Sequence, residues 1–202
     1  MLLCDIGNTN IKIYNDGLVQ IVSQEELLSY QDQRLFYLSV HPSLQSFPDC
    51  KKWINLEPFV SVKSSYNGLG VDRKALCSLV DEGTVIDAGS AITVDVMQDN
   101  IHTGGFIYPG KKAFFEAFRN ISPRLDFSYQ DILKDRLPQE TRSALSYGFI
   151  APLVALVEKL PKPWYVTGGD GGLLLQYLPD AIYRPHMIFE AMKQIIQRNG
   201  LC

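Results

Sequence analysis

The chain has 202 residues, of which 46% are hydrophobic and 20% are charged, and its formal net charge is −3. This composition is ordinary for a globular protein, and it includes no basic run of the kind that neutralises nucleic-acid phosphates. The four cysteines are scattered without paired spacing, which favours reduced thiols in a cytoplasmic setting. No apolar stretch approaches the roughly 20 residues of a membrane span, and the N-terminus lacks the features of a signal peptide. We therefore expect a soluble cytoplasmic protein that binds neither nucleic acid nor a membrane.

The first part of the chain predicts a small mixed sheet followed by a helix. Short apolar runs bounded by turn residues predict strands at residues 2–5, 10–14, 19–23, 34–40 and 56–62. The helical spacing of apolar residues then predicts a helix over residues 71–81, which ends before Glu82 and Gly83. We expect these elements to form a first lobe, residues 1–82.

The same order of strands and helices then starts again. Further strands are predicted at residues 84–87, 91–97, 104–110 and 164–167, and further helices at 111–118, 140–159 and 187–197. Strands followed by helices, twice in one chain, indicate an α/β fold with two lobes. We expect mixed sheets flanked by helices, with the second lobe formed by residues 83–202.

The first strand of each lobe leads into the same kind of loop. The motif "DIGNTNI" begins at Asp5, and the motif "DAGSAIT" begins at Asp87. Both consist of an aspartate at the end of an apolar strand, a glycine, a small polar residue and the start of a second strand. A repeat in the same context at the start of both lobes indicates a duplicated architecture.

The residues of these two loops suit a polyphosphate and its metal ion. A glycine lets a ligand approach the backbone closely, and the N–H groups of such a turn can bind phosphate oxygens. Asn8, Thr9 and Ser90 add side-chain donors, and each aspartate supplies a hard oxygen for a cation. Two hairpins facing each other would hold the ligand from both sides. The alternative is that each loop is only a hairpin turn, because Asp, Gly and Asn are favoured there.

Five motifs occur in a fixed order between Asp5 and Asp170, namely "DIGNTN", "GVDR", "DAGSAIT", "GGFIYPG" and "TGGD". The paired hairpins resemble those of the acetate kinase, sugar kinase, Hsp70 and actin superfamily. The whole set resembles the type III pantothenate kinases, also called the Bvg accessory factor family. The resemblance implies an α/β, two-lobed, actin-like ATPase fold, which is a duplicated ribonuclease H-like unit.

The resemblance also implies an activity, which is the ATP-dependent phosphorylation of pantothenate to 4'-phosphopantothenate in the first step of coenzyme A biosynthesis. The cofactors that it implies are ATP with a divalent cation such as Mg²⁺, and a monovalent cation, K⁺ or NH₄⁺. Family members are cytoplasmic homodimers, so we expect a homodimer with its active site near the interface.

In the first lobe the resemblance assigns Asp72 as the base that orients and deprotonates the substrate hydroxyl. Arg73 could bind the substrate carboxylate through two hydrogen bonds. The residues expected to line the pantothenate pocket are Tyr66, Gly70, Val71, Asp72 and Arg73. Those expected to form the first ATP loop are Asp5, Ile6, Gly7, Asn8, Thr9, Asn10, Ile11 and Lys12. The alternatives are that Asp72 caps a helix, that Arg73 makes a surface ion pair and that Lys12 faces solvent.

In the second lobe the resemblance implies that Ser90 contacts ATP and that Asp87 binds the monovalent cation. Ser122 stands where family members carry a threonine that reaches the pantothenate of the neighbouring subunit. Asp87 could instead be a buried carboxylate satisfied by its own loop. We expect the glycines of "GGFIYPG" to have a structural role near the active site. Those of "TGGD" suit either a tight strand-to-helix turn or N–H groups that face the nucleotide.

Two other functions stay open at this point. One is a non-catalytic nucleotide-binding regulator or scaffold, against which the intact pair of Asp72 and Arg73 argues. The other is a related kinase or phosphohydrolase that acts on another small molecule, since one fold hosts many functions. The three histidines share no ligand spacing and adjoin no motif, so we assign them no role.

Overall fold

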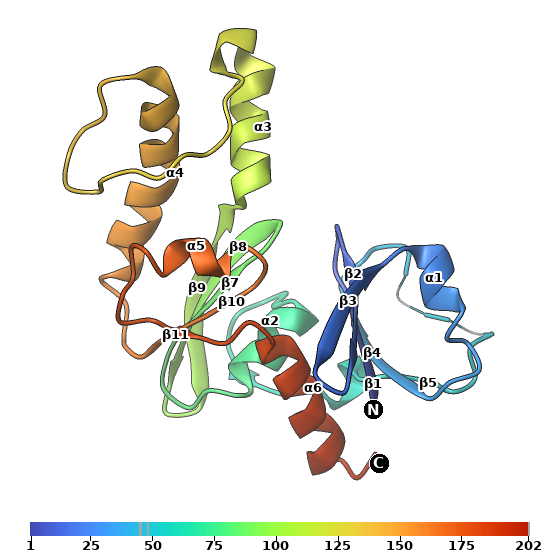
Figure 1. Cartoon of the computed structure of the whole chain (residues 1–202). Helices are drawn as coiled ribbons and strands as arrows, with labels where there is room; N and C mark the ends of the chain where they lie inside the picture. Colours follow the sequence, from blue (N-terminus) through green and yellow to red (C-terminus); the bar gives the residue numbers. More distant parts are fainter. Residues whose placement is uncertain (45, 48, 202) are drawn as a thin grey trace. The chain divides into compact units, whose positions relative to one another are not determined.

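Two β-sheets with one topological plan organise the computed structural model, which describes residues 1–44, 46–47 and 49–201 (Figure 1). The first sheet has the strand order β3-β2-β1-β4-β5, and the second contains the order β9-β8-β7-β10-β11. The strands of the first sheet are β1 (Leu2–Ile6), β2 (Ile11–Asn15), β3 (Leu18–Val22), β4 (Leu35–Ser39) and β5 (Trp53–Asn55). Those of the second are β7 (Gly83–Ala88), β8 (Ala91–Gln98), β9 (Ile101–Pro109), β10 (Trp164–Thr167) and β11 (Ile182–Tyr183), with the short β6 (Lys63–Ser64) at its edge beside β9.

The strand directions repeat as well as the strand order. In each sheet the first strand of the set pairs antiparallel with the strand that follows it in the chain, as β1 does with β2 and β7 with β8. On its other side the same strand pairs parallel with a later strand, as β1 does with β4 and β7 with β10. The structure is therefore a duplicated α/β arrangement, in which β1 and β7 occupy equivalent central positions.

The chain divides into two compact units, each built around one of these sheets. Unit 1 comprises Met1–Asp81, Asp99–His102 and the residues from His186 onward, and unit 2 comprises Glu82–Gln98 and Thr103–Pro185. The C-terminal helix α6 (Met187–Arg198) therefore packs with the N-terminal sheet. The lobe boundary between residues 82 and 83 that the sequence suggests stays a prediction.

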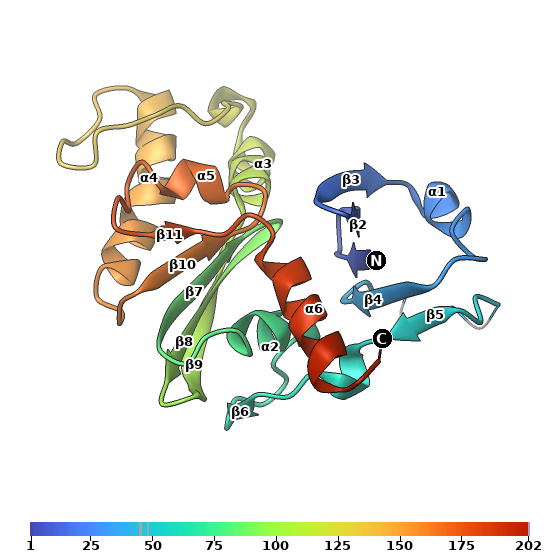
Figure 2. The same ribbon diagram turned by 60° about the horizontal axis from the view of Figure 1, so that its bottom comes forward.

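Unit 1 covers both faces of its sheet, because successive side chains of a strand point to opposite faces. On one face Leu3 of β1 packs with apolar residues of α2 (Val71–Cys77) and α6, and Figure 2 shows these two helices side by side. On the other face Cys4 and Ile6 pack with Leu27 of the short helix α1 (Gln24–Leu28). This alternation places Asp5 on the same face as Leu3, which is the face that α2 covers.

Unit 2 has its core between its sheet and the helices α3 (Lys111–Ile121), α4 (Thr141–Val157) and α5 (Gly171–Leu174). Phe149 of α4 is buried at the centre of this core, and the ring of Phe114 on α3 lies 5.2 Å from it. Phe115 packs against the same ring at 6.3 Å. The aromatic side chains of α3 therefore contribute to the core of unit 2.

Most of the predicted elements are confirmed, and residues 56–62 are the clearest exception because they form no strand. The strand β5 ends at Asn55, and the chain then makes a 3-10 turn, η1 (Glu57–Phe59). Pro58 at the start of this turn has no N–H to donate to a strand partner. The predicted helix at residues 71–81 is also shorter, since α2 ends at Cys77.

Several short elements have no counterpart among the predictions. They are α1, β5, η1, β11, the two-residue strand β6 (Lys63–Ser64) and the 3-10 turn η2 (Pro123–Leu125). In unit 1, β6 pairs parallel with the start of β9, where Ser64 lies opposite His102. None of the helices within the described ranges is long and apolar enough to cross a membrane.

Candidate functional site

The first glycine loop closes the hairpin of β1 and β2. The Gly7 N–H donates a hydrogen bond to the Asn10 carbonyl oxygen at 3.0 Å, and the side chains between them face solvent. Asp5 lies opposite Lys12 in the ladder, and its carboxylate is 3.8 Å from the lysine ammonium. The Lys12 side chain is 30% exposed, so it pairs with Asp5 at the edge of the loop and does not simply extend into solvent.

The Asp5 carboxylate lies in a surrounding that disfavours its charge. Burial, and to a smaller extent the neighbouring carboxylate of Asp72, raise the pKa of Asp5 to about 6, although the Lys12 ammonium acts in the opposite direction. The two carboxylates approach each other because the alternation of β1 turns Asp5 toward α2, where Asp72 lies in the first turn. Two carboxylates close together in a partly buried position would be stabilised by a bound cation.

The "GVDR" segment forms the start of α2. Gly70 is the N-cap residue, so Asp72 is not the cap but the second residue of the helix, and its Oδ1 accepts a hydrogen bond from the Arg73 N–H at 2.8 Å. Arg73 is only 5% exposed, which is not the geometry of a surface ion pair. Its guanidinium carbon lies 5.0 Å from the ring centroid of Tyr66, which is itself 38% exposed. The structure thus brings three of the predicted pocket residues together within unit 1.

Two polar residues beside Tyr66 were missed by sequence reasoning. His102 is 1% exposed, and its Nδ1 is hydrogen-bonded to the Ser64 Oγ at 2.8 Å. The ring of His102 meets the ring of Tyr66 edge to face, with their centroids 5.8 Å apart. The pairing of β6 with β9 creates this arrangement, and neither strand residue belongs to a motif that the sequence singles out. The only available signal was the serine two positions before the tyrosine.

The second glycine loop joins β7 to β8. The Gly89 N–H donates to the Ala91 carbonyl oxygen at 3.0 Å, and Asp87 lies opposite Thr167 of β10. Ser90 at the loop tip is exposed to solvent. The loop is therefore the counterpart of the first one, and its aspartate has the same position at the end of a central strand.

The "GGFIYPG" and "TGGD" motifs both lie against this second loop. A Cβ atom at Gly110 would collide with the carbonyl oxygens of Gly89 and Ser90. A Cβ atom at Gly168 would collide with the Ala88 carbonyl oxygen and the Asp87 carboxylate. Three motifs that are separate in the sequence therefore form one cluster in unit 2, with glycine where the backbones approach most closely.

A salt bridge and a main-chain hydrogen bond hold this cluster together. The Asp170 N–H donates to the Ala88 carbonyl oxygen at 2.9 Å, and the Asp170 carboxylate is 2.5 Å from the Lys111 ammonium. Lys111 is the first residue of α3, directly after Gly110. Asp170 thus connects the "TGGD" turn both to the second loop and to the start of α3.

Ser122 lies at the end of α3, in unit 2. It is half-buried, and its Oγ accepts a hydrogen bond from the Arg124 N–H at 3.2 Å, which caps the turn η2. Tyr66 and the "GVDR" residues, which were predicted to bind the same substrate, belong to unit 1. The hydroxyl of Ser122 therefore has a local structural role within the chain.

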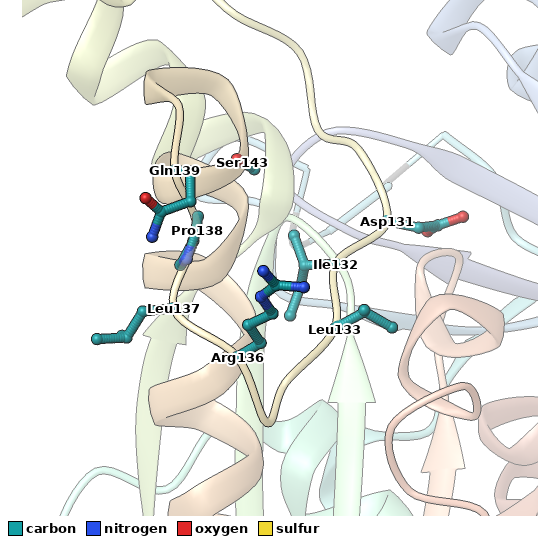
Figure 3. A pocket seen from close by; sticks show the side chains of 8 residues that line it. All are labelled: Asp131, Ile132, Leu133, Arg136, Leu137, Pro138, Gln139 and Ser143. Atoms are coloured by element: carbon teal, nitrogen blue, oxygen red, sulfur yellow. The ribbon is translucent and has the colours of Figure 1, made fainter.

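A surface cavity of about 230 Å³ lies in unit 2, away from all of these motifs in the sequence (Figure 3). It is formed by the segment that leads from η2 into α4, and Arg136 and the exposed Leu137 contribute to its lining. None of the predicted site residues lines it.

Comparison with known proteins gives the family. A family model described as type III pantothenate kinase matches residues 22–162. A relative of that name from Campylobacter jejuni (strain RM1221) is 41% identical over 204 residues, which cover 98% of each chain. Another from Campylobacter hominis is 38% identical over the whole of both chains. The chain belongs to the type III pantothenate kinase family. The enzyme class expected from the resemblance is thereby confirmed, since this is a family of ATP-dependent kinases.

Solved structures show the fold of this family member. A crystal structure described as a Baf family transcriptional activator from Campylobacter jejuni matches all of the chain with a TM-score of 0.91 and 38% identity. The activator of 2-hydroxyisocaproyl-CoA dehydratase from Clostridium difficile, solved with bound ADPNP, matches with a TM-score of 0.51 at 12% identity. The predicted two-lobed actin-like ATPase fold is confirmed.

The close approach at Gly168 leads to a first prediction. Gly168 has φ 88°, a conformation that favours glycine, and a Cβ there would meet Asp87 and Ala88. We expect Gly168→Ala to lower the free energy of unfolding by about 1–3 kcal/mol because of backbone strain, with the collision adding to the loss. Urea denaturation followed by circular dichroism measures this. The control is Gly169→Ala, since nothing lies within 4 Å of the added Cβ. Equal stability of the two variants would contradict the packing described above.

The raised pKa of Asp5 leads to a second prediction. The native state holds a proton on Asp5 at a higher pH than the unfolded chain does, because the pKa is about 6 in place of 3.8. The contribution of Asp5 to stability therefore falls as the pH rises from about 4 to about 6. We expect Asp5→Asn to raise the unfolding free energy at pH 7 by at most about 3 kcal/mol, and to remove this part of the pH dependence.

Urea denaturation between pH 4 and pH 7, in a metal chelator, tests this expectation. Lys12→Met is the complementary variant and should have the opposite effect on stability, because the Lys12 ammonium favours the ionised form of Asp5. We expect its stability to fall more steeply with rising pH than that of the wild type. A less stable Asp5→Asn protein at pH 7 with an unchanged pH profile would show that the carboxylate is not destabilised by its surroundings.

Proposed function

We propose that this chain transfers the γ-phosphate of ATP to the primary hydroxyl of pantothenate, giving 4'-phosphopantothenate. The supporting observation is the group formed by Asp72, Arg73 and Tyr66 at the start of α2, with the Asp5 carboxylate beside it. Membership of the type III pantothenate kinase family supports the same substrate. Phosphoryl transfer requires an aligned acceptor, neutralised charge and a proton acceptor, and these residue types meet those needs.

Asp72 is proposed as the base that takes the proton from the pantothenate hydroxyl. Its carboxylate is held by the hydrogen bond from the Arg73 N–H, so its orientation is fixed before the substrate binds. The lack of a side chain at Gly70 gives the carboxylate room, since a Cβ there would lie 2.6 Å from Oδ1 of Asp72. A positioned carboxylate can both orient a hydroxyl and accept its proton.

Arg73 and Tyr66 are proposed to bind the rest of pantothenate, together with the backbone of Gly70 and Val71. A guanidinium that is 5% exposed is already desolvated, which strengthens its attraction for a substrate carboxylate. Tyr66 lies over this guanidinium and stays partly exposed, so it can contact the substrate from the solvent side. A planar fork such as Arg73 binds a carboxylate with two parallel hydrogen bonds.

The nucleotide is proposed to bind to the loop from Asp5 to Lys12 and to Ser90. Gly7 keeps the backbone of the first loop accessible, and the exposed side chains of Asn8 and Thr9 can donate to phosphate oxygens. Asp5 has the character of a carboxylate that would gain from the divalent cation carried by ATP, with Mg²⁺ the natural choice.

Asp87 is proposed to bind the monovalent cation, K⁺ or NH₄⁺. The residues fit such an ion, because the Asp87 carboxylate and the Ala88 carbonyl oxygen both border the position where a Gly168 side chain would be. Carboxylate and carbonyl oxygens can coordinate K⁺ and can accept hydrogen bonds from NH₄⁺. We further propose a cytoplasmic homodimer in which Ser122 reaches the substrate of the neighbouring subunit.

A regulatory role is the second candidate, because the Campylobacter jejuni structure is described as a transcriptional activator. A nucleotide-binding regulator would share the fold and the two glycine loops. It would have no need of a carboxylate held at the start of α2 beside a buried arginine. This geometry favours the kinase.

The test of the proposed function is a coupled assay of ADP release with ATP, Mg²⁺ and pantothenate, with and without K⁺ or NH₄⁺. We expect pantothenate-dependent turnover that requires the monovalent cation, and a product of the mass of 4'-phosphopantothenate. The absence of product with every cation would exclude the proposed reaction and favour the regulatory candidate. Turnover without K⁺ or NH₄⁺ would exclude the proposed role of Asp87.

The role of Asp72 yields a further prediction. We expect Asp72→Asn to lower kcat by on the order of 10²-fold or more, because the amide cannot accept the proton. Steady-state kinetics measures this, and a melting curve shows whether the variant is folded. Asp81→Asn is the matched control, since Asp81 is exposed and lies beyond the other end of the same helix. An unchanged kcat in Asp72→Asn would assign another group as the base.

A further inference from the structure

The segment before Tyr66 is attached to a buried residue of unit 1. The strand β6 pairs parallel with Ile101 and His102, and Ser64 is the residue opposite His102. His102 is 1% exposed, whereas Ser64 and Tyr66 lie at the surface. A short exposed strand is therefore joined to a fixed buried side chain directly before the predicted pantothenate pocket.

The Ser64 hydroxyl connects His102 to the backbone of Tyr66. Its Oγ lies 2.8 Å from Nδ1 of His102, and it accepts a hydrogen bond from the Tyr66 N–H at 3.0 Å. A serine hydroxyl has one donor and two acceptor positions. Ser64 can thus donate to the imidazole while it accepts from the tyrosine N–H, and both bonds form at the same time.

The ring of Tyr66 is held on two sides. The imidazole of His102 meets it at an interplanar angle of 63°, an edge-to-face arrangement. The Arg73 guanidinium lies over the ring, with its central carbon 5.0 Å from the centroid. Both arrangements are attractive for an aromatic ring, whose face is negative and whose edge is positive. Tyr66 therefore lies in contact with both His102 and Arg73.

We propose that Ser64 and His102 are positioning residues of the acceptor site, which fix Tyr66 and, through it, the guanidinium of Arg73. This proposal rests on the proposed function, because it assigns these residues to the binding of pantothenate. The contacts described above link Ser64 and His102 to Tyr66, and neither residue is among those proposed to bind ATP or to accept the proton. Their loss should weaken the binding of the acceptor and leave the chemical step and the binding of ATP unchanged.

Ser64→Ala is the decisive variant, because Ser64 is exposed and its removal creates no cavity in the core. Loss of a hydrogen bond that holds a binding residue should raise the KM for pantothenate about three- to tenfold. We expect kcat and the KM for ATP to stay within twofold of the wild type. Ser64→Thr keeps the hydroxyl, so its KM for pantothenate should equal that of the wild type.

Ser65→Ala is the matched control. Ser65 is the next residue, is also exposed, and its hydroxyl makes no hydrogen bond to any residue that the structure describes. We expect wild-type kinetics from this variant. An unchanged KM for pantothenate in Ser64→Ala, or an equal rise in the KM for ATP, would overturn the proposal.

A measurement without turnover keeps this proposal separate from the proposed function. The Tyr66 N–H should exchange with deuterium faster in Ser64→Ala than in Ser65→Ala, because its acceptor is gone. It should also exchange faster in His102→Phe, which keeps a ring against Tyr66 and removes the nitrogen that fixes Ser64. Exchange unchanged in a folded His102→Phe protein would show that His102 does not hold Ser64.

The outcomes of the two tests are distinguishable. A wild-type protein that fails to phosphorylate pantothenate refutes the proposed function, and with it the assignment of Ser64 and His102 to acceptor binding. The exchange measurement then still decides whether the two residues fix the Tyr66 segment. If His102→Phe does not fold, the pair of Ser64→Ala and Ser64→Thr decides the proposal.

Discussion

The alternation of side chains along the central strand β1 determines where charge gathers in unit 1. Leu3 must face α2 and α6 to fill the core on that side, and Cys4 and Ile6 must face the other core. The direction of the Asp5 side chain is fixed by this arrangement, because a shift of the strand by one residue would bury it in the opposite core. It therefore faces α2, and the first turn of that helix adds the carboxylate of Asp72.

The consequence is a site that is unfavourable in the protein alone. The raised pKa of Asp5 means that its charge costs stability, and Arg73 is a buried guanidinium next to an aromatic ring. Such groups cluster at functional sites, because a ligand of opposite charge can offset the free energy that is lost when folding buries the charge. A cation near Asp5 would act in this way.

The sequence predicts the features that depend on neighbouring residues, and misses those that depend on distant ones. The glycine loops at Asp5 and Asp87 follow from apolar runs and turn residues, so the duplicated plan of the sheets could be anticipated. The return of α6 to the N-terminal sheet and the pairing of Ser64 with His102 join residues far apart in the chain. The local sequence pattern does not predict which distant strands pair. His102 also lies outside every motif, so nothing in the sequence indicated its role. The failure at residues 56–62 was avoidable, because Pro58 argues against a strand.

Duplication explains why the two loops share a position, and their surroundings explain why they differ. Both follow a central strand that ends in aspartate, yet the first spans Gly7 to Asn10, whereas in the second the Gly89 N–H already bonds to Ala91. Beside the first loop, the Asp72 carboxylate of α2 lies close enough to Asp5 to raise its pKa. The second is completed by backbone, since two other motifs approach it so closely that only glycine fits. The same hairpin therefore neighbours a second carboxylate in unit 1 and closely packed glycine backbone in unit 2. Divergence of the packing around a repeated hairpin, with the hairpin itself retained, is sufficient to give the two copies different chemical surroundings.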